Sequence, residues 1–312
     1  MMLHNHVAQA LSESPLLILD GALATELEAR GCQLADALWS AKVLMENPEL
    51  IYQVHYDYFA AGARCAITAS YQATPQGFAT RGLDQAQSLA LIAQSVELAR
   101  RAREDYLATQ SEAKTLLVAG SVGPYGAFLA DGSEYRGDYA LPEAEMMAFH
   151  RPRIAALLAA GADLLACETL PSFAEAQALA TLLTEFPDST AWFSFTLRDA
   201  GHISDGTPLS EVVGWLNTQP QVVALGVNCV ALESVTPALQ QLQQLTDKPL
   251  VVYPNSGEQY DASSKTWHSA PSGCTLEHKL DEWQRAGAKL IGGCCRTSPK
   301  DIAAIAHACQ PQ

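Results

Sequence analysis

Short apolar segments alternate with longer amphipathic segments along the whole chain. Eight of the apolar segments have the length of β-strands and are apolar on both faces, which is typical of strands buried in a parallel sheet. They lie at residues 16–20, 65–70, 115–121, 163–169, 191–197, 222–229, 249–255 and 289–295.

The segments between these runs have the hydrophobic periodicity of α-helices. They cover residues 47–63, 84–108, 143–162, 172–186, 209–218, 236–245 and 276–288. This alternation predicts an α/β fold, a (β/α)8 TIM-type barrel that residues 1–312 form as a single domain. An open doubly wound sheet has the same local pattern, but no G-x-G-x-x-G follows the first apolar run, so the barrel is favoured.

Composition limits the kinds of partner that the chain can have. Of the 312 residues, 48% are hydrophobic and 17% are charged, which supplies a large core. The net charge of −15 opposes binding to a nucleic-acid backbone. No apolar run reaches the ~18 residues of a membrane span, and no secretory signal is visible at the N-terminus. Cysteines that lie in apolar runs are typical of a reducing compartment. We therefore expect a soluble cytoplasmic protein that binds neither nucleic acid nor membrane.

Polar and thiol residues follow the predicted strands at their carboxyl ends, where barrel enzymes carry their active sites. Three of these residues are cysteines: Cys229 ends the sixth run, and Cys294 and Cys295 end the eighth. Both strands flank the seventh, so their ends can converge. Three thiolates suit Zn²⁺ and leave a fourth position for substrate. Gly292 and Gly293 would let the backbone leave the extended form, so that both adjacent cysteines can reach one ion.

Two other interpretations of the cysteines stay open. A free cysteine is usually a small buried hydrophobe, and this is our interpretation of Cys32, Cys65, Cys167, Cys274 and Cys309. The three thiolates could also form a structural or sensory zinc site in a non-catalytic protein. Such a site requires a fourth protein ligand, which Cys167 or Cys274 could supply.

Two carboxylates and one amide also lie at strand ends. Glu168 follows an apolar strand, where an uncompensated charge is costly, so it either pairs with a buried cation or binds a cationic ligand such as an amino group. Asp20 invites the same two interpretations, and the glycine after it would also suit an ordinary turn. Asn228 either binds substrate or ties down its own loop.

Aromatic and histidine residues give weaker signals. Trp39, Trp192 and Trp267 could line a pocket for a cationic ligand, although most tryptophans are packing residues. His150 lies in an amphipathic helix, and we interpret it as a surface or boundary residue.

Four motifs together resemble the homocysteine S-methyltransferases. They are Asp20-Gly21, the segments at 167–169 and 226–229, and Gly-Gly-Cys-Cys-Arg-Thr at 292–297. The resemblance covers nearly the whole chain. It is strongest to the short members, including bacterial ones, that use S-methylmethionine, and the segments at 70–74, 132–137 and 253–258 also resemble that branch.

The resemblance implies a zinc enzyme that methylates the thiol of L-homocysteine to give methionine. It implies Zn²⁺ on Cys229, Cys294 and Cys295, and homocysteine bound by Asp20, Gly21 and Glu168. Tyr71 occupies a place where related enzymes bring a tyrosine near the metal. We add Tyr71 and Asn228 to the expected substrate contacts.

The methyl donor expected from the resemblance is a sulfonium compound. S-methylmethionine is favoured, with S-adenosylmethionine as a second donor. Folate donors require further domains, and betaine-using relatives carry a C-terminal extension, whereas only 17 residues (312 − 295) follow Cys295 here. Betaine stays an alternative. The oligomeric state is left open, with a monomer as one alternative.

Overall fold

The core of the computed structural model is a barrel of parallel β-strands. The structure describes residues 3–34, 37–112, 114–257, 259–261, 266–268 and 274–309. The barrel strands are β1 (Leu17–Ile18), β2 (Cys65–Ile67), β3 (Leu117–Val122), β4 (Leu164–Leu170), β5 (Ala191–Phe195), β8 (Val222–Asn228), β9 (Leu250–Tyr253) and β12 (Ala288–Ile291). Each pairs in parallel with the next, and β12 pairs back with β1. A parallel bridge between Leu19 and Cys65 joins β1 to β2. The barrel predicted from the sequence is therefore confirmed, with all eight strands at the expected places.

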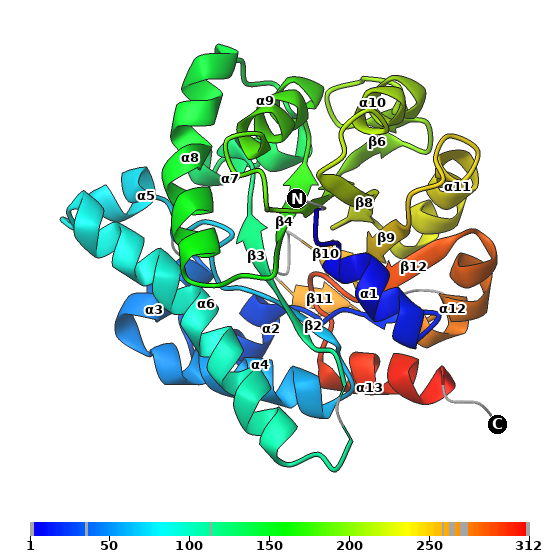
Figure 1. The fold of residues 1–312 in the computed structure, drawn as a ribbon, viewed down its shortest axis with the longest axis horizontal. Coiled ribbons are helices and arrows are strands. Elements are labelled where there is room, and N and C mark those ends of the chain that lie inside the picture. The colour runs from blue at the N-terminus through cyan, green and yellow to red at the C-terminus, as the bar shows by residue number, and fades with distance from the viewer. Residues whose placement is uncertain are drawn as a thin grey trace.

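Helices surround the strands, as Figure 1 shows. They are α4 (Pro48–Ala60), α6 (Gln85–Ala108), α8 (Glu143–Ala159), α9 (Phe173–Leu183), α10 (Leu209–Leu216), α11 (Leu232–Leu242), α12 (Leu276–Arg285) and α13 (Pro299–Ala308). The first seven correspond to the predicted helices. The helix predicted at 236–245 begins earlier, at Leu232, and contains Pro237. Helix α13 was not predicted, although Ser298 and Asp301 form a capping box at its start.

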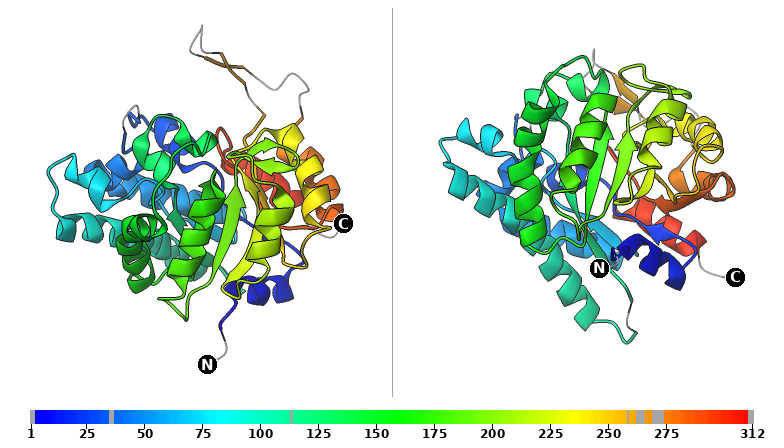
Figure 2. Two further views of the ribbon diagram at one scale, coloured as in Figure 1. Left: turned by 90° about the horizontal axis from the view of Figure 1, so that it is seen from above. Right: turned by 45° about the horizontal axis from the view of Figure 1, so that its top comes forward.

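Several short elements escaped prediction because they are too short to show a hydrophobic period. Helix α1 (His6–Glu13), capped by Asn5, lies near one end of the barrel. The others are α2 (Leu23–Ala29), α3 (Ser40–Glu46), α5 (Pro75–Ala79), α7 (Tyr125–Leu129), the 3₁₀ helix η1 (Ser133–Tyr135), and the hairpins β6 (Leu197–Asp199) with β7 (His202–Ile203) and β10 (Gln259–Asp261) with β11 (Thr266–His268). Figure 2 shows α1 and the β10–β11 hairpin at opposite ends of the barrel. Most of these elements follow barrel strands, so they build up the end at which the strands finish.

Two groups of buried side chains fill the molecule. The larger group lies between the strands and the helices, and the smaller one fills the inside of the barrel. Trp192, fully buried, belongs to the inner group, where its indole N–H donates to the Tyr253 hydroxyl at 3.0 Å. The strand ends are thus fixed from both sides, which gives the residues that follow them a rigid support.

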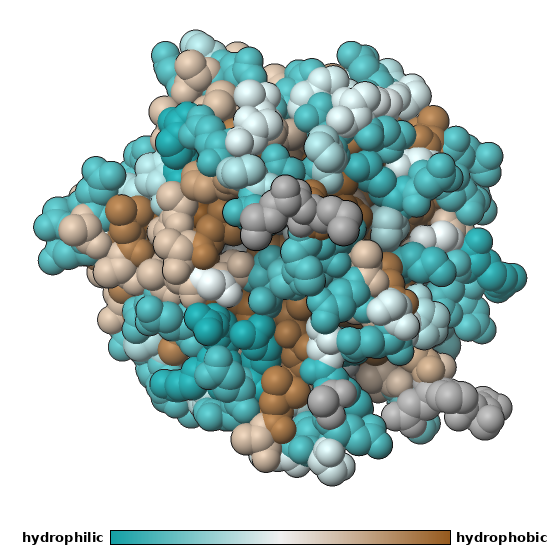
Figure 3. All heavy atoms as spheres, in the orientation of Figure 1, coloured by the Kyte–Doolittle hydropathy of each residue, from teal (hydrophilic) through white to brown (hydrophobic). Residues whose placement is uncertain are grey.

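The face that carries α1 is mainly hydrophilic, with hydrophobic residues in small separate areas (Figure 3). Within the described residues, none of the helices combines the length and hydrophobicity needed to cross a bilayer.

Gly226 lies where two barrel strands leave no room for a side chain, and this gives a stability prediction. A Cβ atom on Gly226, in β8, would lie 1.8 Å from the carbonyl oxygen of Val251 in β9. Gly226→Ala must therefore force the two strands apart, and overpacking of this kind costs roughly 1–3 kcal/mol or more. We expect a lower midpoint of urea unfolding, measured by circular dichroism.

Gly214→Ala is the matched control. Gly214 lies in α10, and a Cβ atom there would meet nothing within 4 Å. Alanine in place of a helical glycine is expected to stabilise by roughly 0.5–1 kcal/mol. Equal effects of the two substitutions would contradict this account of the barrel wall.

Candidate active site and metal centre

A cavity of about 400 Å³ opens at the carboxyl ends of the barrel strands. Its wall contains every residue selected from the sequence as a metal ligand or substrate contact: Asp20, Gly21, Tyr71, Glu168, Asn228, Cys229, Cys294 and Cys295. These residues come from five different strand ends, and the fold alone brings them together.

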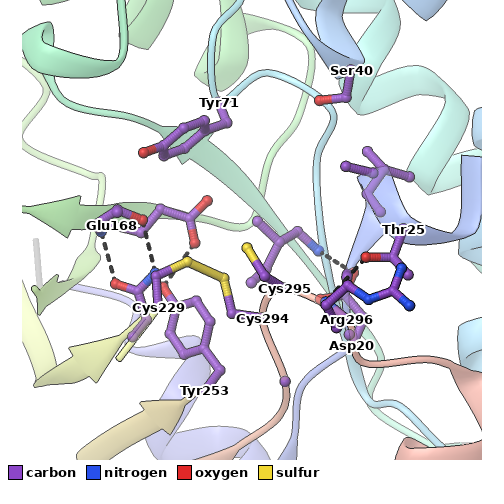
Figure 4. Close-up of a pocket in the computed structure, with 18 of the residues that line it drawn as sticks. Asp20, Thr25, Ser40, Tyr71, Glu168, Cys229, Tyr253, Cys294, Cys295 and Arg296 are labelled. Atoms are coloured by element: carbon purple, nitrogen blue, oxygen red, sulfur yellow. Dashed lines mark hydrogen bonds between the residues drawn. A yellow bond between two sulfur atoms is a disulfide. The ribbon is translucent and has the colours of Figure 1, made fainter. Parts of the chain in front are cut away.

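The three cysteines selected as metal ligands meet in this cavity. The sulfur atoms of Cys229, Cys294 and Cys295 all lie within 4.8 Å of one another. Three sulfurs around one zinc ion at ~2.3 Å each would lie ~3.8 Å apart, so this spacing is suitable for a zinc site. Figure 4 shows the Cys295 sulfur directed towards the other two.

Cys229 and Cys294 are joined by a disulfide, with their Cα atoms 5.5 Å apart, while Cys295 is free. The sequence analysis did not predict this bond, because it interpreted the cysteines as reduced. Thiolates are the metal ligands, so the bond must be reduced before all three sulfurs can bind an ion.

The loop that carries Cys294 and Cys295 is held against the end of β1. The amide of Gly293 donates to the Asp20 carbonyl oxygen at 3.1 Å, and a Cβ atom on Gly292 would lie 2.6 Å from the same oxygen. Gly292 is therefore needed for close approach between the two backbones, whereas Gly293 leaves room for the Thr297 side chain, 2.4 Å from the position of a Cβ atom. The left-handed turns fall instead on Cys229 (φ 50°) and Arg296 (φ 66°).

Thr297 and Tyr58 lock this contact in place. The Thr297 hydroxyl accepts from the Ala22 amide at 3.1 Å and donates to the Cys294 carbonyl oxygen at 2.6 Å. The Tyr58 hydroxyl donates to the Ala22 carbonyl oxygen at 2.8 Å. The segment after Asp20 and the cysteine loop therefore form one rigid unit.

Glu168 is buried beside the sulfur cluster and is only 7% exposed. The hydroxyls of Ser121 and Tyr253 donate to its two carboxylate oxygens, the second at 2.8 Å. Burial raises the pKa of Glu168, and these two hydrogen bonds oppose the rise. Sequence reasoning missed Tyr253, although it is a polar residue near the end of a predicted apolar strand.

Asp20 is the second buried carboxylate, and one of its oxygens accepts from the Ile67 amide at 2.9 Å. Burial raises the pKa of Asp20 well above its usual value, and the negative charge of Glu168 raises it further. In the described part of the chain, neither carboxylate has an ion-pair partner within 4.0 Å. A cationic ligand would stabilise both charges.

Asn228 ties the end of β8 to the neighbouring strand β5 and, beyond it, to β4. Its side-chain oxygen accepts from the Thr169 amide at 2.8 Å and from the Ser194 hydroxyl at 2.7 Å, and its amide group donates to the Thr169 hydroxyl at 2.8 Å. Thr169 has a φ of 58°, so these bonds hold a left-handed residue directly after Glu168.

The remaining candidates lie in the cavity, in the core, or outside the described residues. Trp39 lines the cavity, whereas Trp192 packs inside the barrel and the side chain of Trp267 lies outside the described residues, as does Glu258 of the 253–258 motif. The interpretation of His150 as a surface or boundary residue is wrong, because it is fully buried and contacts Glu175.

The closed zinc site considered as an alternative requires a fourth protein ligand. Among the described residues, neither Cys167 nor Cys274 belongs to the sulfur cluster, and Cys167 packs between the strands and the helices. The geometry of the described chain therefore favours an open site.

The comparison with known families agrees with this site. A family model described as homocysteine S-methyltransferase matches residues 17–309. The chain belongs to the homocysteine S-methyltransferase family. It is 68% identical to the homocysteine S-methyltransferase of Escherichia coli (strain K12) over 98% of this chain and 99% of that protein. It is 53% identical to a homocysteine S-methyltransferase of Bacillus subtilis (strain 168), covering 97% of each chain.

Solved structures of a member of this methyltransferase family share the fold. The homocysteine methyltransferase MmuM from Escherichia coli superposes with a TM-score of 0.90 at 65% identity, covering 97% of this chain and 99% of that one. It has been solved in a metallated and in an oxidized form with the same TM-score. Family membership makes this chain a methyltransferase, and the family resemblance inferred from its motifs is confirmed.

The raised pKa of Glu168 gives a prediction for stability against pH. An unfolded glutamate titrates near ~4.3, and the folded pKa is higher because the carboxyl is buried. The stability gained by burying neutral Glu168 is complete below the unfolded pKa and is lost as the pH rises through the folded pKa. Glu168→Gln does not titrate. As the pH rises from 4 to 8, the unfolding free energy of wild type should therefore fall relative to that of Glu168→Gln, as measured by urea unfolding.

Glu185→Gln is the control of opposite sign. Glu185 is exposed and paired with Arg151, whose hydrogen bonds lower the pKa of Glu185. The stability that ionised Glu185 contributes is present above the unfolded pKa and is lost as the pH falls. The unfolding free energy of wild type should therefore rise slightly relative to that of Glu185→Gln as the pH rises. A pH-independent difference for Glu168→Gln would contradict the burial argument.

Proposed function

We propose that this chain transfers a methyl group from a sulfonium donor, with S-methylmethionine favoured, to the thiol of L-homocysteine in a zinc-dependent reaction. The observation that carries the proposal is one cavity that contains three clustered cysteine sulfurs and two buried carboxylates. In this proposal, residues 1–312 form one catalytic domain.

Zn²⁺ would be held by Cys229, Cys294 and Cys295 after reduction of the disulfide. When bound there, it would bind the homocysteine thiol at its fourth position and favour loss of the thiol proton. The chain's own contribution is to keep the three sulfurs in place, through the contacts of Gly293 and Thr297 with the end of β1.

The amino group of homocysteine is proposed to bind beside Glu168 and Asp20. Burial disfavours both charges, and the two carboxylates disfavour each other. An ammonium group near them would relieve both penalties, so the positive charge of the substrate would be recognised strongly. Gly21 lines the cavity beside Asp20, and only glycine fits there because a Cβ atom would lie 2.8 Å from the Tyr58 hydroxyl. We assign Gly21 a backbone contact with homocysteine. We assign Asn228 a substrate contact in addition to its hydrogen bonds with Thr169.

The methyl transfer itself is a displacement at carbon. The homocysteine sulfur supplies an electron pair to the methyl carbon, the bond from that carbon to the donor sulfur breaks, and the donor leaves as a neutral thioether. The thiol proton goes to solvent. S-methylmethionine and homocysteine thus give two molecules of methionine. No residue needs to protonate the leaving group, so the protein's task is to align donor and acceptor.

Cavity size and lining support a small cationic donor. A volume of about 400 Å³ is near the lower end of the range for ligand pockets, which is suitable for small substrates. Trp39, Tyr71 and Tyr135 line the same cavity, and aromatic faces attract sulfonium cations as they attract other cations.

A panel of donors on reduced, zinc-loaded protein tests the proposal directly. With homocysteine as acceptor, we expect methionine formation to be fastest with S-methylmethionine, slower with S-adenosylmethionine and slowest with betaine, each at equal concentration. Amino-acid analysis measures the product. Faster turnover with betaine would overturn the choice of donor, and no turnover with any donor would overturn the function.

Cys294→Ser and Cys309→Ser form the matched pair of variants. Cys294 belongs to the sulfur cluster, whereas Cys309 lies at the end of α13. Cys294→Ser should remove both zinc, measured by elemental analysis, and activity, while Cys309→Ser should keep both. Full zinc content and full turnover in Cys294→Ser would contradict the proposal that Cys294 binds zinc and that zinc is required for methyl transfer.

A further inference from the structure

A buried charged network lies against the loops that follow β2 and β3 and takes no part in the mechanism above. Arg153 and His150 of α8 are 1% and 0% exposed, and Glu175 of α9 is 0% exposed. None of them lines the cavity. A buried cation is costly, and cores rarely contain one without a specific role for its hydrogen bonds.

The Arg153 guanidinium joins two loops that follow neighbouring strands. One terminal nitrogen donates to the Tyr71 carbonyl oxygen at 2.7 Å, after β2, and the other donates to the Gly123 carbonyl oxygen at 2.6 Å, after β3. A planar guanidinium can make both bonds at once, whereas a lysine ammonium lacks this fork. Arg153 therefore fixes the backbone of Tyr71 relative to β3.

His150 and Glu175 hold the guanidinium in turn. Arg153 can only donate, so the His150 Nδ1 atom, at 2.9 Å, must accept, and the proton lies on Nε2. That Nε2 atom donates to Glu175 at 2.7 Å. Glu175 also accepts from the Tyr125 amide at 2.7 Å and from the Tyr139 hydroxyl. The carboxylate thus balances the charge of Arg153 through a neutral histidine.

Gly123 restricts the same tyrosine from its other side. A Cβ atom on Gly123 would lie 2.4 Å from the Tyr71 carbonyl oxygen and 2.7 Å from its ring. The Tyr71 ring consequently packs directly on the glycine and extends into the cavity, where Figure 4 shows it on the same side as Glu168 and Cys229.

We propose that Arg153 is a positioning residue for methyl transfer, which acts by holding the Tyr71 backbone so that the ring faces the reacting sulfur atoms. The inference rests on the proposed function, because Tyr71 has a role only if the cavity carries out that reaction. Arg153 does not touch the substrates. Its loss should therefore change the rate of the aligned reaction and leave the homocysteine and zinc contacts unaltered.

Arg153→Lys tests this role, since it keeps the charge for Glu175 but removes the fork. We expect kcat with S-methylmethionine to fall about 10–100-fold, because small misplacements of aligning groups cost up to about 100-fold in rate. The Kd for homocysteine, measured by calorimetry, and the zinc content should stay as in wild type. Unchanged kcat, or parallel losses in kcat, homocysteine affinity and zinc content, would overturn the proposal.

Gly123→Ala perturbs Tyr71 from its other side while Arg153, His150 and Glu175 all stay in place, and it serves if Arg153→Lys does not fold. It should lower kcat with the same unchanged Kd, and the double variant should lose less than the product of the two single effects. Arg151→Lys is the control, because Arg151 lies on the same helix in an exposed ion pair with Glu185. Independent, multiplicative effects would contradict a shared action through Tyr71. Absence of turnover in wild type would refute the proposed function instead.

Discussion

The close packing of the cysteine loop against the end of β1 is the constraint on which the site depends. Gly292 places no side chain between the loop and the β1 end, and Gly293 leaves room for Thr297. The Thr297 hydroxyl bonds to the Ala22 amide on one side and to the Cys294 carbonyl oxygen on the other. This contact sets the position of Cys294 and Cys295 relative to Asp20. Cys229 then completes the cluster from β8, which is separated from β12 only by β9. Three sulfurs from distant parts of the sequence thus converge because the order of strands places the ends of β8 and β12 one strand apart on the same rim of the barrel.

The two buried carboxylates of the site carry an electrostatic cost that their hydrogen bonds offset only in part. Two buried carboxylates raise each other's free energy, and the hydrogen bonds of Ser121 and Tyr253 offset only part of the cost for Glu168. Such a pair is costly in the empty protein and favourable around a cation. Arg153 is the opposite case, because Glu175 balances its buried positive charge within the protein, through His150. The network around Arg153 is thus completed within the protein itself.

Much of this organisation could be predicted from the sequence. The strands were recognisable because strands buried on both faces are continuous apolar runs, and the barrel topology then placed Asp20, Glu168 and the cysteines at one end. Features that depend on three-dimensional contacts could not be predicted in this way. Tyr253 and Ser121 are unremarkable in sequence and acquire meaning only through the carboxylate they contact. His150 was misplaced because its helix is only weakly amphipathic. The proximity of Cys229 and Cys294 was predicted, but the bond between them was not, because both were interpreted as reduced thiolates.

X-ray absorption at the zinc edge identifies the atoms that bind the metal and so decides whether the site is open. For reduced protein loaded with zinc, the account predicts three sulfur ligands without homocysteine and a fourth when homocysteine is added. Cys309→Ser protein, which keeps all three sulfurs of the cluster, provides the control and should give the same two results. Four sulfur ligands before any substrate is added, unchanged by homocysteine, would contradict the claim that the three cysteines leave a position open for the substrate sulfur.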